Sequence, residues 1–319
     1  MARLRDQEEF GPTLDAAAER LGISPTAVEK DYWVSQVLKA LAEGYGGDFV
    51  FKGGTSLFKA YRIVERFSED VDILVLPGER GRNAVDTLMK RMAESAAAAV
   101  GGTLAAVGSR ETGRHRAYEV SYPATRQATA LIRTGVLLEM GVRGGSQPHE
   151  TRPIGCLLGD ALAVEVPDLS PYDDLAPFEV SVLHPGRTLL EKLVLIHALA
   201  QQLVVDPSTP IPPRSGRHFY DVHQLLGEDR VSTLLGDRDQ VREVMTSVEE
   251  ITRRHFGGGD GVRPEDGFAV CPAFDLDSEV SALLRAAYEA TMPELHFGDA
   301  PLPTWEAICT RVTGMATLL

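Results

Sequence analysis

Apolar residues in the first quarter of the chain recur at two spacings, one typical of helices and one typical of strands. Ser24-Pro25 is typical of a helix start, and apolar residues follow at helical spacing from Val28 until the glycines at 44, 46 and 47. Four further elements are predicted: a strand at 48–51, a turn at Gly53-Gly54, a helix at 55–64 and a strand at 71–76. Strand, glycine turn, helix and strand in this order predict an α/β opening.

The pattern changes from mixed to helical near residue 186. Before that point it predicts a helix at 82–99 and strands at 103–107, 116–122 and 134–141, while the acidic stretch 160–179 is predicted to be a solvated rim. After it, helices are predicted at 188–204, 220–226, 238–254 and 278–291. We therefore predict an α+β fold in which residues 1–185 form a mixed sheet with N-terminal helices and residues 186–319 form a helical C-terminal domain.

The composition is that of an ordinary globular protein. The chain has 319 residues, of which 44% are hydrophobic and 24% are charged. We see no apolar run that approaches the roughly 20 residues of a membrane-spanning helix, and no apolar stretch typical of a signal peptide at the start. We therefore expect a cytoplasmic protein with no membrane partner. The cysteines at 156, 271 and 309 lack the paired spacing of metal or redox sites.

The formal net charge of −14 is unevenly distributed along the chain. A strongly acidic protein is a poor candidate for a general nucleic-acid-binding surface, because phosphate contacts need Lys and Arg. Residues 52–143, however, contain 14 Lys and Arg against 10 Asp and Glu, whereas residues 264–319 contain two Arg against nine acids. The first half of the chain can therefore still contact a polyanion.

Residues 51–76 contain the most informative combination of polar residues. Gly53-Gly54 lets the backbone approach a ligand, and the next helix begins where free N–H groups favour phosphate. Asp70 and Asp72 occupy positions i and i+2 of a strand, so their carboxylates point to the same face. Neighbouring carboxylates repel each other, and Mg²⁺, which prefers carboxylates and substrate phosphate oxygens, relieves that repulsion.

A third carboxylate would allow two metal ions to be held for in-line phosphoryl chemistry. Glu139 is the candidate, because a charged side chain in the apolar run 136–140 needs compensation. Two alternatives stay open. Asp70 and Asp72 can be solvated acids at a strand edge, and Glu139 can face water on an alternating strand.

Five short motifs occur in order along the chain. They are Glu29-Lys-Asp-Tyr-Trp33, Lys52-Gly-Gly-Thr-Ser56, Arg66-Phe-Ser-Glu-Asp-Val-Asp72, His184-Pro-Gly-Arg-Thr-Leu-Leu-Glu-Lys192 and Arg217-His-Phe-Tyr-Asp221. With these motifs the chain resembles the AbiEii/AbiGii nucleotidyltransferase-like toxin family, which includes the MenT-type toxins of type IV toxin–antitoxin systems. The resemblance covers most of the chain, but no diagnostic motif follows residue 221.

The resemblance implies a polymerase-β-like nucleotidyltransferase core and assigns roles by position. Asp70 and Asp72 would be the metal carboxylates of a two-metal Mg²⁺ site, with Glu139 as a third. Lys192 would neutralise nucleotide phosphates from the first C-terminal helix, and Asp221 would lie at the same cleft. The residues on the triphosphate side would be Lys52, Gly53, Gly54, Thr55 and Ser56. Ser68 stands where MenT-like members have a serine that can be phosphorylated as an inhibitory switch.

From the residues alone, Lys192 and Asp221 also have simpler explanations. Lys192 can form an ion pair with Glu191 or extend its ammonium group to the surface. Asp221 can pair with an arginine of the basic segment 214–218.

The implied reaction transfers a nucleotidyl group from an NTP to a hydroxyl acceptor and releases pyrophosphate. By the resemblance the acceptor is the 3′ end of tRNA, which would block translation, and a cognate antitoxin is implied. The candidate basic track for tRNA is Arg110, Arg114, Arg116, Arg126, Arg133 and Arg143. Two other functions stay open: nucleotidylation of a protein or small molecule, and a catalytically silent member that binds nucleotide or RNA or acts through an antitoxin. The oligomeric state is unknown.

Overall fold

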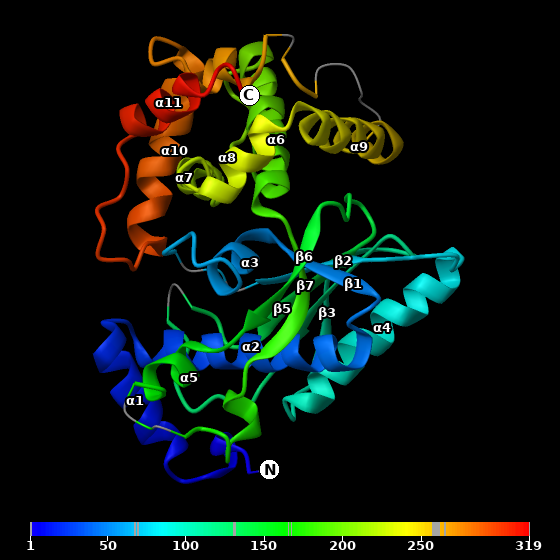
Figure 1. The fold of residues 1–319 in the computed structure, drawn as a ribbon, viewed down its shortest axis with the longest axis vertical. Coiled ribbons are helices and arrows are strands. Elements are labelled where there is room, and N and C mark those ends of the chain that lie inside the picture. The colour runs from blue at the N-terminus through cyan, green and yellow to red at the C-terminus, as the bar shows by residue number, and fades with distance from the viewer. Residues whose placement is uncertain are drawn as a thin grey trace. The chain divides into compact units, whose positions relative to one another are not determined.

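The computed structural model describes residues 2–66, 68, 70–129, 132–164, 166, 168–256, 262–264 and 266–318. They form two compact units (Figure 1): residues 1–60 with 68–182, and residues 61–67 with 183–319. Sequence analysis placed 61–67 in the first domain. The segment belongs to the second unit, in which its buried Arg66 is bonded to Asp221.

A mixed sheet of seven strands lies at the centre of the first unit, in the order β3-β4-β5-β2-β1-β7-β6. The strands are β1 (Phe49–Lys52), β2 (Asp70–Val75), β3 (Leu104–Glu111), β4 (His115–Val120), β5 (Val136–Gly141), β6 (His149–Ile154) and β7 (Phe178–Leu183). β2 pairs antiparallel with β1 and parallel with β5. The predicted α+β fold with a mixed sheet is confirmed.

In the part of the first unit that the structure describes, the sheet is accompanied by α1 (Phe10–Leu21), α2 (Pro25–Tyr45), α3 (Gly53–Lys59), α4 (Arg82–Ala99) and α5 (Leu157–Leu162). α2 begins as predicted, since the Ser24 side chain accepts a hydrogen bond from the Ala27 N–H and Pro25 occupies the first turn. α2 contacts α1, α4, α5 and strands β2 and β5, and it runs along the sheet in Figure 1. Every residue from 27 to 39 of α2 is consequently buried.

The burial of α2 includes charged side chains of its first motif, each of which is bonded to another segment. The Glu29 carboxylate accepts backbone N–H groups of residues 125–126, and the Lys30 ammonium group donates to carbonyl groups within residues 133–135. Both partners lie in the chain between β4 and β5. These bonds therefore fix the loop that delivers β5 to the centre of the sheet.

Asp31 connects α2 to two further helices. Its Oδ1 lies 2.5 Å from the Lys59 ammonium group at the end of α3, and its Oδ2 accepts the Leu157 N–H at the start of α5 at 2.7 Å. The side chains of Asp31 and Lys59 are only 7% and 2% exposed. Asp31 and Lys59 therefore form a buried, nearly water-free ion pair that holds α3 against α2.

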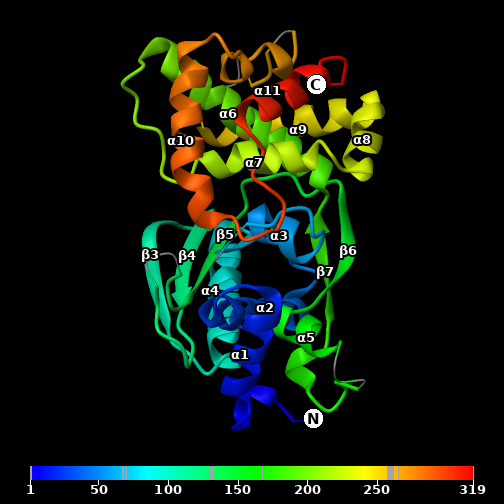
Figure 2. The same ribbon diagram turned by 90° about the vertical axis from the view of Figure 1, so that its left-hand side faces the viewer.

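The second unit is helical. It contains α6 (Pro185–Val205), α7 (Gly216–Leu225), α8 (Asp229–Gly236), α9 (Arg238–Phe256), α10 (Glu279–Leu295) and α11 (Trp305–Gly314). α6 contacts α7, α8, α9 and α10, and Figure 2 shows these helices gathered around it. α6 is thus the central helix of this unit.

α6 corrects one expectation from the sequence, because by length and composition alone this helix could cross a membrane. In the structure half of its most apolar stretch is buried within the protein. It also buries Arg187, which is bonded to Glu191 and Ser247, and Lys192. An apolar helix surrounded by other helices, with charged side chains paired inside the unit, is typical of a core helix.

Several elements differ from the sequence predictions. The helix predicted at 55–64 ends at Lys59, and Arg62 has a positive φ of 56°, which a helix cannot accommodate. The hydrophobic pattern did not predict β6, β7, α5, α8 or α11. The stretch 160–179 is not simply a solvated rim: it includes the buried Asp174, whose carboxylate accepts the Leu4 N–H and the Tyr32 hydroxyl, and the start of β7.

The Asp31–Lys59 pair yields a prediction about stability. Lys59→Met should lower the free energy of unfolding by about 3–5 kcal/mol, because it leaves the Asp31 carboxylate buried without its cation. Adding Asp31→Asn should recover part of the loss. The measurement is urea unfolding followed by circular dichroism.

Lys90→Met is the matched control, since Lys90 pairs with Glu94 on α4 with side chains 58% and 54% exposed. That pair should contribute less than about 1 kcal/mol. Equal losses in Lys59→Met and Lys90→Met would contradict a structural role for the buried pair.

Candidate functional site

Two of the predicted metal carboxylates lie on one face of β2. Asp70 and Asp72 are half-buried and alternate with the buried Val71 and Ile73. The apolar residues anchor the strand in the sheet, so the two carboxylates project from the opposite face. The same-face placement predicted for Asp70 and Asp72 agrees with this alternation of half-buried and buried residues along β2.

The neighbours of Asp72 across the sheet are also polar. Asp72 is in register with Lys52 on β1 and with Glu139 on β5. Side chains in register on adjacent strands lie on the same face, so the three strands place an ammonium group and two carboxylates in one row. Lys52 is half-buried and has no ion-pair partner within the described part of the chain.

Gly53 gives Asp72 the space that its carboxylate occupies. Gly53 has a φ of +80°, and a Cβ atom built there would lie 2.0 Å from Asp72 Oδ2. An L-residue would be strained at this φ and would also overlap the carboxylate. The glycine turn and the acidic strand therefore form a single structure, in which the backbone of α3 begins against Asp72.

The hydroxyl groups of the glycine turn are used within the protein. The Thr55 hydroxyl donates to the Asp70 carbonyl at 2.5 Å and lies 2.8 Å from the Ser68 hydroxyl, while the Ser56 hydroxyl donates to the Gly53 carbonyl at 2.8 Å. Thr55 and Ser56 are buried and Ser68 is half-buried. These contacts tie the turn to β2.

The acidic face suits a hard cation, although it does not form a closed cage. In the part of the chain that the structure describes, no group of three or more His, Cys, Asp or Glu side chains is close enough to hold a metal ion. Mg²⁺ usually needs only one or two protein carboxylates, because substrate phosphates and water complete its octahedron. Asp70 and Asp72, half-buried beside a turn that keeps Asp72 in place, fit that requirement.

Lys192 and Asp221 belong to a buried ionic cluster in the helical unit. Asp221 is fully buried; it accepts two hydrogen bonds from Arg66, from Nε and Nη2, both at 2.6 Å, and its Oδ2 lies 2.8 Å from Lys192 Nζ. Lys192 Nζ lies 3.3 Å from His218 Nδ1. Neither alternative from the sequence holds, because Glu191 pairs with Arg187 and Asp221 pairs with residues outside 214–218.

Burial and charge shift the pKa values within this cluster. Burial lowers the pKa of Lys192, and the charges of Arg66 and Arg217 lower it further against the attraction of Asp221. Although burial raises it, the pKa of Asp221 is held below its ordinary value by Arg66 and Lys192. Burial and the neighbouring Lys192 lower the pKa of His218 to about 3, so His218 is neutral and its Nδ1 accepts from Lys192.

Sequence analysis missed the roles of three residues in this cluster. Arg66 is 1% exposed and provides two of the hydrogen bonds to Asp221. In the sequence Arg66 is only the first residue of its motif. It lies 155 positions before Asp221, so no local pattern indicated the contact. His218 and Arg217 precede Asp221 by three and four residues on α7, a spacing that places them on the same side of the helix. This spacing in the sequence could have indicated that Arg217 and His218 lie beside Asp221.

The basic track predicted in the first unit is largely neutralised. Arg114 and Arg143 both pair with Glu111, Arg116 pairs with Asp86, and Arg126 pairs with Asp15. Arg133 is exposed, and the side chain of Arg110 lies outside the described residues. The predicted track is therefore mostly a set of structural ion pairs and supplies little free positive charge for RNA.

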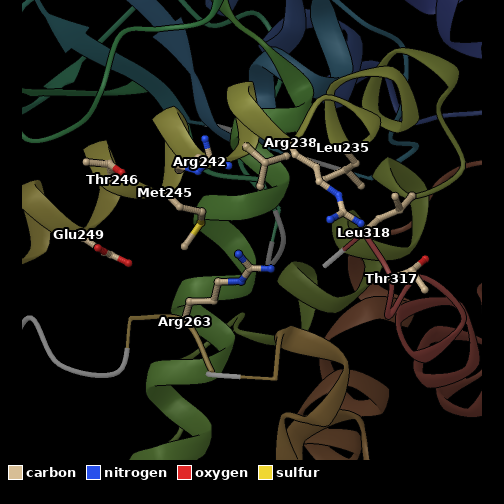
Figure 3. A pocket seen from close by; sticks show the side chains of 10 residues that line it. Leu235, Arg238, Arg242, Met245, Thr246, Glu249, Arg263, Thr317 and Leu318 are labelled. Atoms are coloured by element: carbon tan, nitrogen blue, oxygen red, sulfur yellow. The ribbon is translucent and has the colours of Figure 1, made fainter.

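A cavity of 520 Å³ in the helical unit contains none of the predicted site residues (Figure 3). Its polar lining includes Arg238, Arg242, Arg263 and Glu249. Asp237 and Asp239 lie at the start of α9, the helix that carries Arg238, Arg242 and Glu249. Asp239 pairs with Arg242. Arg242 is thus paired, and the Glu249 carboxylate lies in the same lining, so the positive charge around this cavity is partly offset.

Two comparisons with known proteins found similarity. The family model described as "Nucleotidyl transferase AbiEii toxin, Type IV TA system" matches residues 36–311. The nucleotidyltransferase toxin MenT4 from Mycobacterium tuberculosis H37Rv has a similar structure, with a TM-score of 0.59 and 18% sequence identity over 95% of this chain and 89% of that one. At this identity the structural likeness concerns the fold. No curated protein matches the sequence.

The contact between Gly53 and Asp72 can be tested by a double-mutant cycle. Gly53→Ala should cost more stability than Gly101→Ala, which has a similar φ of +66° with no atom near its Cβ and so should lose only the roughly 1–2 kcal/mol of left-handed strain. In an Asp72→Ala background most of the excess should disappear. The measurement is denaturant unfolding of all four combinations. A cost at Gly53 no larger than at Gly101 would contradict the close approach.

The state of His218 yields a pH prediction. Its pKa of about 3 in the folded protein is below the value of about 6.5 expected when unfolded, so only the unfolded chain binds this proton between those values. Stability should therefore fall as pH decreases from 6.5 towards 3, by up to about 1.4 kcal/mol per pH unit from this residue. Between pH 6.5 and 4.5 the free energy of unfolding of His218→Gln should fall by about 2 kcal/mol less than that of wild type. Identical pH profiles of unfolding would contradict a neutral His218.

Proposed function

Because this chain belongs to the AbiEii nucleotidyltransferase toxin family of type IV toxin–antitoxin systems, we propose that it transfers a nucleoside monophosphate from an NTP to the 3′ end of tRNA and thereby blocks translation. The observation that carries the proposal is the row of Lys52, Asp72 and Glu139 on three adjacent strands, beside a turn at Gly53 that leaves room for the carboxylate. Carboxylates next to an ammonium group and a half-buried glycine turn suit a metal-bound triphosphate better than they suit a neutral ligand.

In the proposed reaction the acceptor hydroxyl oxygen attacks the α-phosphorus of the NTP. A new P–O bond forms, the bond to the bridging oxygen of the β-phosphate breaks, pyrophosphate leaves, and the hydroxyl proton passes to solvent. Such transfer needs mainly positioning and charge stabilisation from the protein. Lys52, Gly53, Gly54, Thr55 and Ser56 are the residues that we assign to the triphosphate. Lys52 offers charge, whereas Thr55 and Ser56 act by fixing the turn, since their hydroxyls are bonded internally.

Asp70 and Asp72 are the residues that we assign to Mg²⁺. Glu139 is in register with Asp72, but we assign it no metal-ligand role, because the described residues bring no three such side chains close enough to hold a metal ion. When bound, Mg²⁺ neutralises triphosphate charge and makes an acceptor hydroxyl easier to deprotonate. The contribution of the chain is to keep Asp72 in place: its backbone is held in the sheet, and Gly53, which has no side chain, leaves the space that the carboxylate occupies.

In the helical unit we propose that Lys192 neutralises phosphate charge and that Asp221 positions the Lys192 ammonium group. Asp221 is fully buried and both of its oxygens are bonded to Arg66 or Lys192. It is therefore suited to orienting the Lys192 ammonium group. Direct contact between Asp221 and substrate would require these bonds to break.

Regulation and location are further parts of the proposal. Phosphorylation of Ser68 would replace its contact with Thr55 by a dianionic group two residues from Asp70, and the added negative charge would oppose triphosphate binding. The family implies a cognate antitoxin. We place the reaction in the cytoplasm, where NTPs and tRNA are present.

The direct test is incubation with each α-labelled NTP, Mg²⁺ and total tRNA, followed by gel separation of the RNA. Wild type should label tRNA, a chelator should abolish labelling, and added Mg²⁺ should restore it. Asp72→Asn should be at least roughly 100-fold slower, since a charge-stabilising group is lost. Asp6→Asn is the matched control, because it removes a carboxylate that is 62% exposed and distant in sequence from the motifs.

Three outcomes would contradict parts of this proposal. Wild type that binds NTP without transferring it would indicate the catalytically silent alternative. Label in a protein band or a small molecule would identify a different acceptor on the same core. An Asp72→Asn variant as active as wild type would exclude the assigned carboxylates.

A further inference from the structure

The ionic cluster of the helical unit contains more positive than negative charge. Arg66 and Lys192 share the single carboxylate of Asp221, and Arg217 adds a third cation. His218 is neutral, so it offsets none of this charge. A surplus of buried or half-buried cations costs free energy unless a bound anion compensates it.

Arg217 is the member of the cluster that is left without a counterion. It stands four residues before Asp221 on α7, the spacing at which an Arg–Asp pair ordinarily forms on a helix. The oxygens of Asp221 are instead bonded to the forked guanidinium group of Arg66 and to Lys192. Arg217 is half-buried and makes no ion pair within the described residues of the chain.

The other charged groups near the cluster do not remove this surplus. On α6, Glu191 is committed to Arg187 at 2.9 Å. Glu65 precedes Arg66, but its side chain is exposed to water, where its effect on the cluster is screened. With Asp221 and Glu65 both counted, the three cations still outnumber the acids.

We propose that Arg217 binds a polyphosphate anion, together with Lys192, and that the triphosphate of the NTP is the ligand. A guanidinium group presents a planar fork of donors that matches two phosphate oxygens, and a half-buried guanidinium gains more from such a pair than an exposed one. Neutral His218 supports this arrangement, because its Nδ1 accepts from Lys192 and so helps to orient the ammonium group. The identity of the ligand as an NTP rests on the proposed function, whereas polyphosphate binding does not.

The test measures binding of inorganic tripolyphosphate by titration calorimetry, with chelator present so that binding depends on the cations of the chain. Arg217→Gln should weaken binding by about tenfold or more, since a charge-assisted hydrogen-bonded pair is lost. Arg217→Lys should lie between wild type and Arg217→Gln. Arg253→Gln is the matched control, because Arg253 is an exposed arginine of α9 with no role in the cluster. The affinity of this variant for tripolyphosphate should stay within about twofold of wild type.

Thermal unfolding separates this role from a structural one. Without ligand, Arg217→Gln should unfold at the same temperature as wild type or higher, because removing an unpaired cation relieves repulsion with Lys192. Tripolyphosphate should raise the unfolding temperature of wild type more than that of Arg217→Gln. If wild type does not bind tripolyphosphate, or if Arg217→Gln binds it as wild type does, the proposal is wrong. A wild type that binds through Arg217 but transfers no nucleotide contradicts only the proposed function.

Discussion

The carboxylate of Asp221, enclosed by Arg66 and Lys192, is the interaction on which the organisation of the helical unit depends. It is fully buried, so its cost of desolvation has to be offset by both cations together. Arg66 comes from a segment that interrupts the first unit between α3 and β2. The pair therefore determines to which unit residues 61–67 belong. Because both oxygens of Asp221 are bonded to Arg66 or Lys192, Arg217 has no acidic partner among the described residues. Burial and the charge of Lys192 keep His218 neutral.

The first unit also buries charge, on α2, and there each charged side chain of the first motif has hydrogen-bond partners. Glu29, Lys30 and Asp31 follow one another on α2, and each is bonded to a different segment: residues 125–126, residues 133–135, and the two helices α3 and α5. A purely apolar helix could pack as tightly but could not specify which loop lies where. The charged groups of α2 are thus all engaged in holding the fold, whereas Arg217 in the helical cluster makes no ion pair among the described residues and keeps its donors available for a ligand.

The sequence was sufficient to predict the parts of the structure that rest on local rules. The Ser24-Pro25 start of α2, the glycine turn, and the shared face of Asp70 and Asp72 all follow from backbone geometry over a few residues. The register of Lys52, Asp72 and Glu139 could not be derived in this way, since strand order is set by pairing between distant segments. The partner of Asp221 was missed for the same reason. β7 was missed because its alternating pattern lies next to an acidic stretch that resembles a solvated surface, although Asp174 in that stretch is itself buried.

The net charge of −14 now has a more specific meaning for function. The excess of basic residues between 52 and 143 suggested that the first unit could attract RNA, yet four of the six arginines between positions 110 and 143 are paired with Glu111, Asp86 or Asp15. Ion pairs of this kind contribute little long-range field, because each cation is cancelled at short distance. Unpaired cations of the described chain, by contrast, include Lys52 in the glycine-turn motif and Arg217 next to Lys192. An acidic protein can bind phosphate through a few unmatched cations, because local charge at contact distance outweighs the screened charge of a distant surface.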